Sequence, residues 1–130
     1  SNFLNDEKLN SKSIIICLEN LGWLKKTPLG LSYSNWIGDI YSKDIFEKKW
    51  RDKIWWEPYP IEQIDSLIGL SKKLLSKFSI DHKFIGHNTK VEGVKLFNGI
   101  VCRSNFNNRF TDLSPSFNYE YFKNNIENEG

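Results

Sequence analysis

The architecture is most readily inferred from residues 99–117, which read Gly-Ile-Val-Cys-Arg-Ser-Asn-Phe-Asn-Asn-Arg-Phe-Thr-Asp-Leu-Ser-Pro-Ser-Phe. The apolar run Gly99 to Arg103 predicts a short strand, and a polar loop follows it. Phe84-Ile85-Gly86 predicts a second short strand. Ser13 to Asn20 is a continuous apolar run rich in β-branched residues, which is typical of a strand covered on both faces. We expect that run to form a central strand.

Two helices are predicted around these strands. Pro60 is suited to a first helical turn, and apolar residues recur near helical spacing from Ile61 to Phe78. A second, short amphipathic helix is predicted from Tyr119 to Ile126. Residues 21–59 hold all five tryptophans and predict long loops, with short strands around Trp36–Tyr41. This order of elements predicts an α/β fold, a mixed central sheet flanked by helices.

A chain of 130 residues fits one domain. We expect residues 1–12 to be a polar arm or linker, residues 13–126 the domain, and residues 127–130 a frayed tail. The chain starts at Ser1 and contains no Met, so we expect that an upstream segment was cleaved or not included. The net charge of +2 does not indicate a nucleic-acid partner. No apolar run approaches the roughly 18 residues of a membrane span, so a soluble protein is expected.

The cysteines Cys17 and Cys102 are too few for a disulfide framework and lack the spacing of a structural zinc site. The sequence favours two free buried thiols. One disulfide between them is the alternative, since both lie in predicted core strands.

Three landmarks together resemble the zinc N-acetylmuramoyl-L-alanine amidases, the relatives of the peptidoglycan recognition proteins. Ser13 to Asn20 is similar to the family's Ser-Ile-Gly-Ile-Glu-Leu-Glu-Asn strand. The stretch from Trp50-Arg51 through Trp55-Trp56-Glu57-Pro58-Tyr59 and Gln63 is similar to the Trp-Glu-Pro-Tyr…Gln that precedes the long helix in phage-type members. Arg103 to Phe117 resembles the segment that carries His-Ser and then Arg-Lys-Thr-Asp-Pro-Gly-Pro. The resemblance covers about residues 13–122 and implies the amidase fold.

The resemblance also implies a chemistry, the zinc-dependent hydrolysis of the amide between N-acetylmuramic acid and L-alanine in peptidoglycan. Zinc needs three protein ligands and one open position. Asp112 matches the ligand aspartate, whereas Arg103 stands where a ligand histidine is expected. The family's first ligand histidine lies upstream of Ser13 and is missing from this chain. Arginine stays protonated and repels zinc, so Arg103 is expected to pair with Asp112 instead.

His87 offers a replacement ligand, because Phe84-Ile85-Gly86-His87 also resembles the family's Gly-His zinc motif. Its separation of 25 residues from Asp112 then requires an insertion between them. The alternative is that His87 is a polar surface residue and that Asp112 starts a turn. Cys17 falls at the family's catalytic glutamate, and Glu19 shares its face of the predicted strand, so both are candidates for the catalytic position.

The resemblance and the residue types together assign substrate binding to Asn20, Trp36, Trp55, Trp56, Tyr59, Arg103 and Arg109. Core packing is the alternative role for the aromatic members of this set. The adjacent Trp55 and Trp56 cannot both point inward from one strand, so one is expected to line a glycan or peptide groove.

Two functions are therefore expected. The first is a peptidoglycan amidase of a phage or prophage, associated with the virion or released to the bacterial cell wall, with zinc as cofactor. The second is a non-catalytic, amidase-derived module that binds peptidoglycan or other virion proteins.

Overall fold

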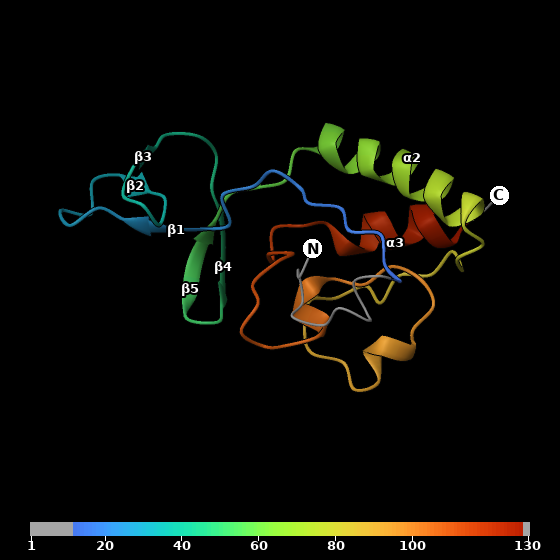
Figure 1. Ribbon diagram of the computed structural model, residues 1–130. Helices are drawn as coiled ribbons and strands as arrows, with labels where there is room; N and C mark the ends of the chain where they lie inside the picture. The colour runs from blue at the N-terminus through green and yellow to red at the C-terminus, as the bar shows by residue number, and fades with distance from the viewer. Residues whose placement is uncertain (1–11, 129–130) are drawn as a thin grey trace.

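The computed structural model describes residues 12–128 and has two parts, which lie side by side in Figure 1. The sheet lobe, residues 23–56, is a five-stranded sheet. The helical lobe, residues 57–128, contains two α-helices and long loops. The elements in chain order are β1 (Trp23–Lys26), β2 (Tyr33–Ser34), β3 (Ile40–Tyr41), β4 (Phe46–Trp50), β5 (Lys53–Trp56), α2 (Ile61–Lys77), the 3₁₀ turns η1 (Val94–Leu96) and η2 (Arg103–Asn105), and α3 (Tyr119–Glu127).

The sheet has the strand order β3-β2-β1-β5-β4, and all its named pairs are antiparallel. β4 and β5 form a hairpin whose two-residue turn is Arg51-Asp52, with φ of 51° and 64°. Positive φ at both turn residues matches the right-handed twist of paired strands, although Asn-Gly is the usual pair. Trp56 fills the inside of this lobe, since it is completely buried and its Nε1 donates to the Lys48 carbonyl at 2.8 Å.

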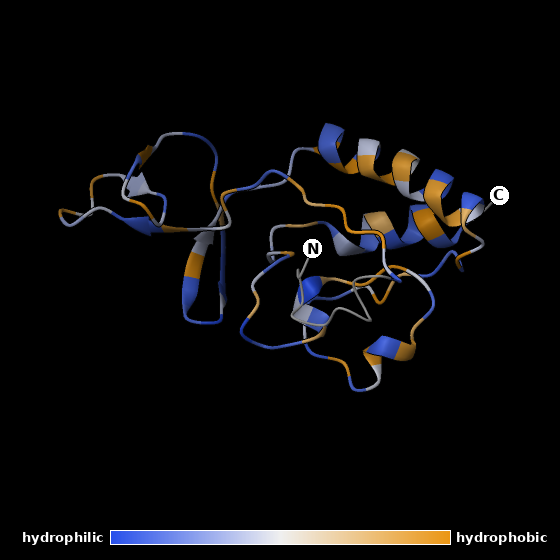
Figure 2. Cartoon of the chain, in the orientation of Figure 1, coloured by the Kyte–Doolittle hydropathy of each residue, from blue (hydrophilic) through white to orange (hydrophobic). Residues whose placement is uncertain are grey.

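Helix α2 forms as the sequence predicts. Its buried residues recur every three or four positions, so one face is apolar, as Figure 2 shows. The helix ends in a Schellman motif: the Ile80 N–H donates to the Leu75 carbonyl at 2.9 Å, and Ser79 has a φ of 56°. The buried positions are Ile64, Ile68, Ser71 and Leu75.

Helix α3 packs against α2 and completes the core of the helical lobe. It begins at the Asn118 N-cap, whose side chain accepts a hydrogen bond from the Tyr121 N–H at 3.1 Å. The predicted helix over 119–126 is therefore confirmed, and it continues to Glu127. The core joins both helices to the loops after them through Ile64, Ile68, Leu75, Phe84, Cys102, Phe117, Phe122 and Ile126.

The predicted central strand is wrong. Residues 13–20 have no regular secondary structure, and Ile14, Ile15 and Ile16 are 47%, 36% and 39% exposed. A strand requires a neighbour that satisfies its backbone N–H and C=O groups, and no described segment forms a β-ladder with this run. The β-branched composition alone was not sufficient to make it a strand.

The two other predicted core strands are reduced to one parallel bridge between Phe84 and Ile100. The α/β character of the fold is confirmed. The expected arrangement is not what the described residues form: their sheet is antiparallel and lies beside the helices instead of between them. The predicted arm and tail, residues 1–12 and 127–130, lie mostly outside the described range, although Glu127 belongs to α3. Between residues 12 and 128 no helix is both long and apolar enough to cross a bilayer.

Candidate functional site

The loops that carry His87 and Asp112 are hydrogen-bonded to each other. The residue after His87 is Asn88, whose Nδ2 donates to the carbonyl of Leu113, the residue after Asp112, at 3.0 Å. The carbonyl of His87 accepts a hydrogen bond from Asn105 Nδ2, also at 3.0 Å. The two residues that the sequence proposes as zinc ligands thus lie on adjacent loops, although 25 positions separate them in the chain.

Asn105 joins the His87 loop to η2, the 3₁₀ turn that also carries Arg103. It is completely buried, and all its side-chain polar atoms are used. Its Oδ1 accepts from the Cys102 N–H at 2.7 Å, and its Nδ2 donates to the carbonyls of His87 and Thr89 at 3.0 and 2.7 Å. Its own carbonyl accepts from the Val91 N–H at 2.9 Å. A buried amide with satisfied donors and acceptor fixes the relative position of the segments it joins.

The sheet lobe contributes Arg51 to the same region. Its guanidinium donates to the carbonyl of Phe110, to the carbonyl of Asn88 at 3.4 Å and to Asn108 Oδ1 at 3.3 Å. Arg51 is the first of the two turn residues of the β4–β5 hairpin, and its side chain reaches these groups from there. The hairpin therefore supports the loop before Asp112.

Asp112 is paired with Arg103, as the sequence predicts. Arg103 Nη1 lies 3.8 Å from Asp112 Oδ1, and the guanidinium lies 4.0 Å from the centre of the Phe110 ring. The Asp112 side chain is half exposed, and its main-chain carbonyl accepts from the Ser104 N–H at 2.9 Å. The carboxylate is therefore accessible, and a cation lies beside it.

His87 is exposed, and its Nδ1 is used within its own loop. Nδ1 is 3.3 Å from the Thr89 N–H donor and 2.9 Å from Thr89 Oγ1. This fixes the ring orientation and leaves Nε2 as the nitrogen suited to a metal. Within residues 12–128 no group of three His, Cys, Asp or Glu residues is placed to hold a metal ion. A complete three-ligand zinc site would therefore need a ligand from outside these residues.

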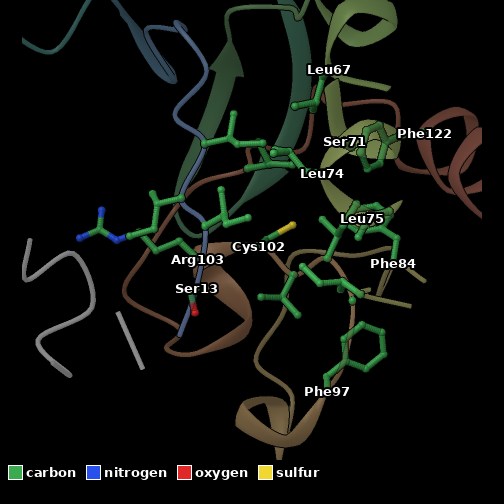
Figure 3. Close-up of a pocket in the computed structure, with 18 of the residues that line it drawn as sticks. Ser13, Leu67, Ser71, Leu74, Leu75, Phe84, Phe97, Cys102, Arg103 and Phe122 are labelled. Atoms are coloured by element: carbon green, nitrogen blue, oxygen red, sulfur yellow. The ribbon is translucent and has the colours of Figure 1, made fainter. Parts of the chain in front are cut away.

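A cavity of about 720 Å³ lies between residues 12–18, α2 and the loops after it. Figure 3 shows Arg103 on the opposite side of this cavity from Phe84 and Phe97. Asp112 and Cys17 also line it, whereas His87 does not.

The two candidates for the catalytic position lie near this cavity. Cys17 and Glu19 are both exposed, and the Glu19 carbonyl accepts from Gln63 Nε2 at 3.0 Å. Because residues 13–20 form no strand, the expectation that Cys17 and Glu19 share a strand face is wrong. Cys17 is also not a buried thiol, contrary to expectation. Both cysteines are free, and burial raises the pKa of Cys102 to about 12.

The predicted binding residues fall into different environments. Trp56 belongs to the core, and Trp55 is half-buried with its ring 5.6 Å from that of Tyr33, so the two tryptophans differ as expected. Tyr59 packs on Phe117 at 5.3 Å, and burial raises its pKa to about 12. These contacts give Trp56 and Tyr59 packing roles.

The other binding candidates also lie in different environments. Trp36 is 59% exposed in the β2–β3 turn. Asn20 joins the segment before β1 to the start of the helical lobe, since its Nδ2 donates to the carbonyls of Glu57 and Pro58 at 3.2 Å. Arg109 is exposed, and its guanidinium lies 5.7 Å from the Phe110 ring. Among these residues Arg103 and Arg109 flank the Asp112 loop, and the tryptophans lie in the sheet lobe.

Three important residues of this region were not identified from the sequence: Asn88, Asn105 and Arg51. An asparagine in a polar loop carries no signal that it is buried, because loops are normally rich in this residue. The adjacency of Asn88 to His87 is the one available indication. Comparisons of the chain with protein-family models, curated proteins and solved structures give no match.

Proposed function

We propose that the chain is a peptidoglycan-directed domain related to the zinc N-acetylmuramoyl-L-alanine amidases, with His87 and Asp112 as two of the zinc ligands. One observation carries this proposal: the hydrogen bond from Asn88 to Leu113 joins the two ligand loops directly, and η2 joins them indirectly, since Asn105 donates to His87 and the Ser104 N–H donates to Asp112. The insertion that the sequence requires between His87 and Asp112 is consistent with these bonds, because the chain leaves the first loop and returns beside it.

The residues present fit two positions of such a site. His87 supplies Nε2, with its ring oriented through Nδ1 and Thr89. Asp112 supplies a half-exposed carboxylate. When bound, zinc would polarise the scissile carbonyl and acidify a water molecule. The third protein ligand would come from outside residues 12–128.

The remaining residues have roles that do not depend on holding the metal. Arg103, beside Asp112, is placed to bind the developing negative charge on a substrate carbonyl oxygen, as a cation in a partly buried site does. Glu19 and Cys17 stay the candidates for positioning the attacking water, and the carboxylate of Glu19 is the better acceptor for a water proton. Arg109 and Trp55 are proposed to contact the glycan or the peptide stem.

The test is zinc binding followed by muropeptide hydrolysis. The full chain, and any longer product that its gene encodes, is dialysed against trace zinc and analysed for bound metal. His87→Ala should remove the metal, and the matched control His82→Ala should retain it. Equal zinc content in the parent and His87→Ala would refute the assignment of His87.

A second function, binding of peptidoglycan or of a virion protein without cleavage, is favoured by the contact between Arg103 and Asp112. In this alternative the ion pair stabilises the loop and the carboxylate never binds metal. Arg103→Gln distinguishes the two functions. It should raise zinc affinity if Asp112 is a ligand, and only lower stability if the ion pair is structural. In either case we propose a phage or prophage protein that acts at the cell wall or in the virion.

A further inference from the structure

The end of the sheet lobe farthest from the helices exposes apolar side chains that the proposed amidase site does not use. Residues 27–38 read Thr-Pro-Leu-Gly-Leu-Ser-Tyr-Ser-Asn-Trp-Ile-Gly and contain no charged residue, although 26% of the chain is charged. In the β1–β2 turn, Leu29 and Leu31 are 82% and 84% exposed. The β2–β3 turn, at the other end of β2, also exposes Trp36 and Ile37, by 59% and 66%.

Both turns are held by hydrogen bonds. In the β1–β2 turn the Thr27 N–H donates to the Ser32 carbonyl at 2.8 Å, and the Gly30 N–H donates to the Thr27 carbonyl at 2.8 Å. In the β2–β3 turn Asn35 Oδ1 accepts from three successive N–H groups, those of residues 37–39, each at 3.0 Å. The leucines are therefore presented to water on an ordered turn, which is unfavourable unless something covers them.

The position of the β1–β2 turn favours a lipid bilayer over a protein as its binding partner. Figure 1 shows this turn projecting beyond β1 at the outer end of the lobe, and Figure 2 shows apolar colour at its tip. A projecting tip with two leucines and no charge can enter the interface of a bilayer, whereas a protein partner would need a complementary hollow.

Two lysines next to the turn provide positive charge that is complementary to an anionic membrane surface. Lys25 and Lys26 are exposed and directly precede the uncharged run. Lys26 Nζ lies 5.2 Å from the Trp55 ring, which holds the cation on the sheet behind the turn. The first acidic residue on the other side of the run is Asp39. Basic residues just behind an apolar tip are attracted to anionic lipid headgroups.

We propose that the β1–β2 turn, residues 27–32, is a peripheral membrane-binding tip that inserts Leu29 and Leu31 into the interface of an anionic bilayer. Lys25 and Lys26 contact the lipid phosphates. This proposal is independent of the proposed amidase site, since it concerns the opposite end of the molecule and needs no metal.

The test is cosedimentation of the full chain with vesicles of phosphatidylcholine containing about one-third phosphatidylglycerol, with pure phosphatidylcholine vesicles in parallel. Leu29→Ser/Leu31→Ser should reduce the partition coefficient at least about tenfold, since each leucine loses apolar surface to bury. Lys25→Gln/Lys26→Gln should lower binding to the anionic vesicles by about fivefold or more. Leu96→Ser is the matched control, because Leu96 is 90% exposed but lies in η1 of the helical lobe, and this variant should bind as the parent does.

Three results would overturn the proposal. In the first, the parent chain does not sediment with anionic vesicles. In the second, Leu29→Ser/Leu31→Ser binds these vesicles as well as the parent does. In the third, analytical ultracentrifugation without lipid shows a dimer that Leu29→Ser/Leu31→Ser abolishes, which would assign the tip to a second copy of the chain. Because the substituted side chains are exposed, none of these variants is expected to prevent folding.

Discussion

Replacing Asn105 with alanine should destabilise the protein by about 2–3 kcal/mol. Three backbone groups lose their side-chain partner at once: the buried N–H of Cys102 and the partly buried carbonyls of His87 and Thr89. Each buried polar group left without a partner costs about 1–3 kcal/mol. Asn105 is completely buried, so water cannot replace the lost bonds without entering the core.

The assay is urea denaturation of the parent and the variant, with the free energy of unfolding obtained by linear extrapolation. The matched control is Asn98→Ala, because Asn98 is an exposed asparagine of the same loop region, and its replacement should change stability by no more than about 0.5 kcal/mol. A loss of less than about 1 kcal/mol for Asn105→Ala would refute the reasoning, because it would mean that the amide does not hold the His87 loop against η2.

A second substitution at this position separates hydrogen bonding from volume. Asn105→Asp keeps the size of the side chain but places a carboxylate against the carbonyls of His87 and Thr89. Burial and these two acceptors raise the pKa of the new carboxyl group, so the folded state binds its proton more tightly than the unfolded state does. The stability of this variant relative to the parent should therefore increase as the pH falls. A pH-independent difference would contradict this account.

Three further predictions concern other parts of the molecule. Ser79→Gly should stabilise the protein by about 0.5–1 kcal/mol in urea denaturation, because Ser79 adopts φ of 56° at the end of α2, where glycine is unstrained; a loss of stability would contradict the Schellman assignment. A thiol reagent should modify Cys17 in the native protein and Cys102 only after unfolding, since Cys17 is exposed and burial raises the pKa of Cys102 to about 12; native labelling that persists in Cys17→Ser would be inconsistent with this. Glu127→Gln should lower stability at neutral pH, because hydrogen bonds from Lys123 and from the Phe84 N–H lower the pKa of Glu127 below 4.5; the difference from the parent should disappear as the pH falls from 4.5 through that lowered pKa, and an undiminished difference in strong acid would disprove the assignment.

The helices could be predicted from the sequence because their signals are local. Apolar residues at helical spacing identified both α2 and α3. The contrast between Trp55 and Trp56 was also predictable, since neighbouring side chains on a strand point to opposite faces. Periodicity thus gives both the existence of an element and its orientation.

The predicted strand over 13–20 failed because a strand depends on partners that its own sequence does not identify. The β-hairpin of β4 and β5 was missed for the opposite reason. Its turn is Arg51-Asp52, which lacks the Asn-Gly signature, and β4 is Phe-Glu-Lys-Lys-Trp, which has no apolar alternation. The contacts of Arg51 with the Asp112 loop help to explain why an arginine occupies that turn.

The candidate ligand residues could be predicted from the sequence, but the residues that hold their loops in place could not. Asp112, Arg103 and His87 were identified from a motif, and the contact between Arg103 and Asp112 was expected from charge. Asn88 and Asn105, which bring the loops together, resemble any other loop asparagine in sequence. Long-range hydrogen bonds between two loops become visible only in the folded chain.

Zinc affinity, measured by competition with a chromophoric chelator, tests most directly the claim that His87 and Asp112 form one site. The parent, His87→Ala, Asp112→Asn and His82→Ala are compared under the same conditions. We predict that His87→Ala and Asp112→Asn each weaken zinc binding at least about tenfold, as the loss of one ligand should, while His82→Ala does not change it. Zinc binding that is equal in all four proteins, or absent from the parent and from any longer gene product, would contradict the account.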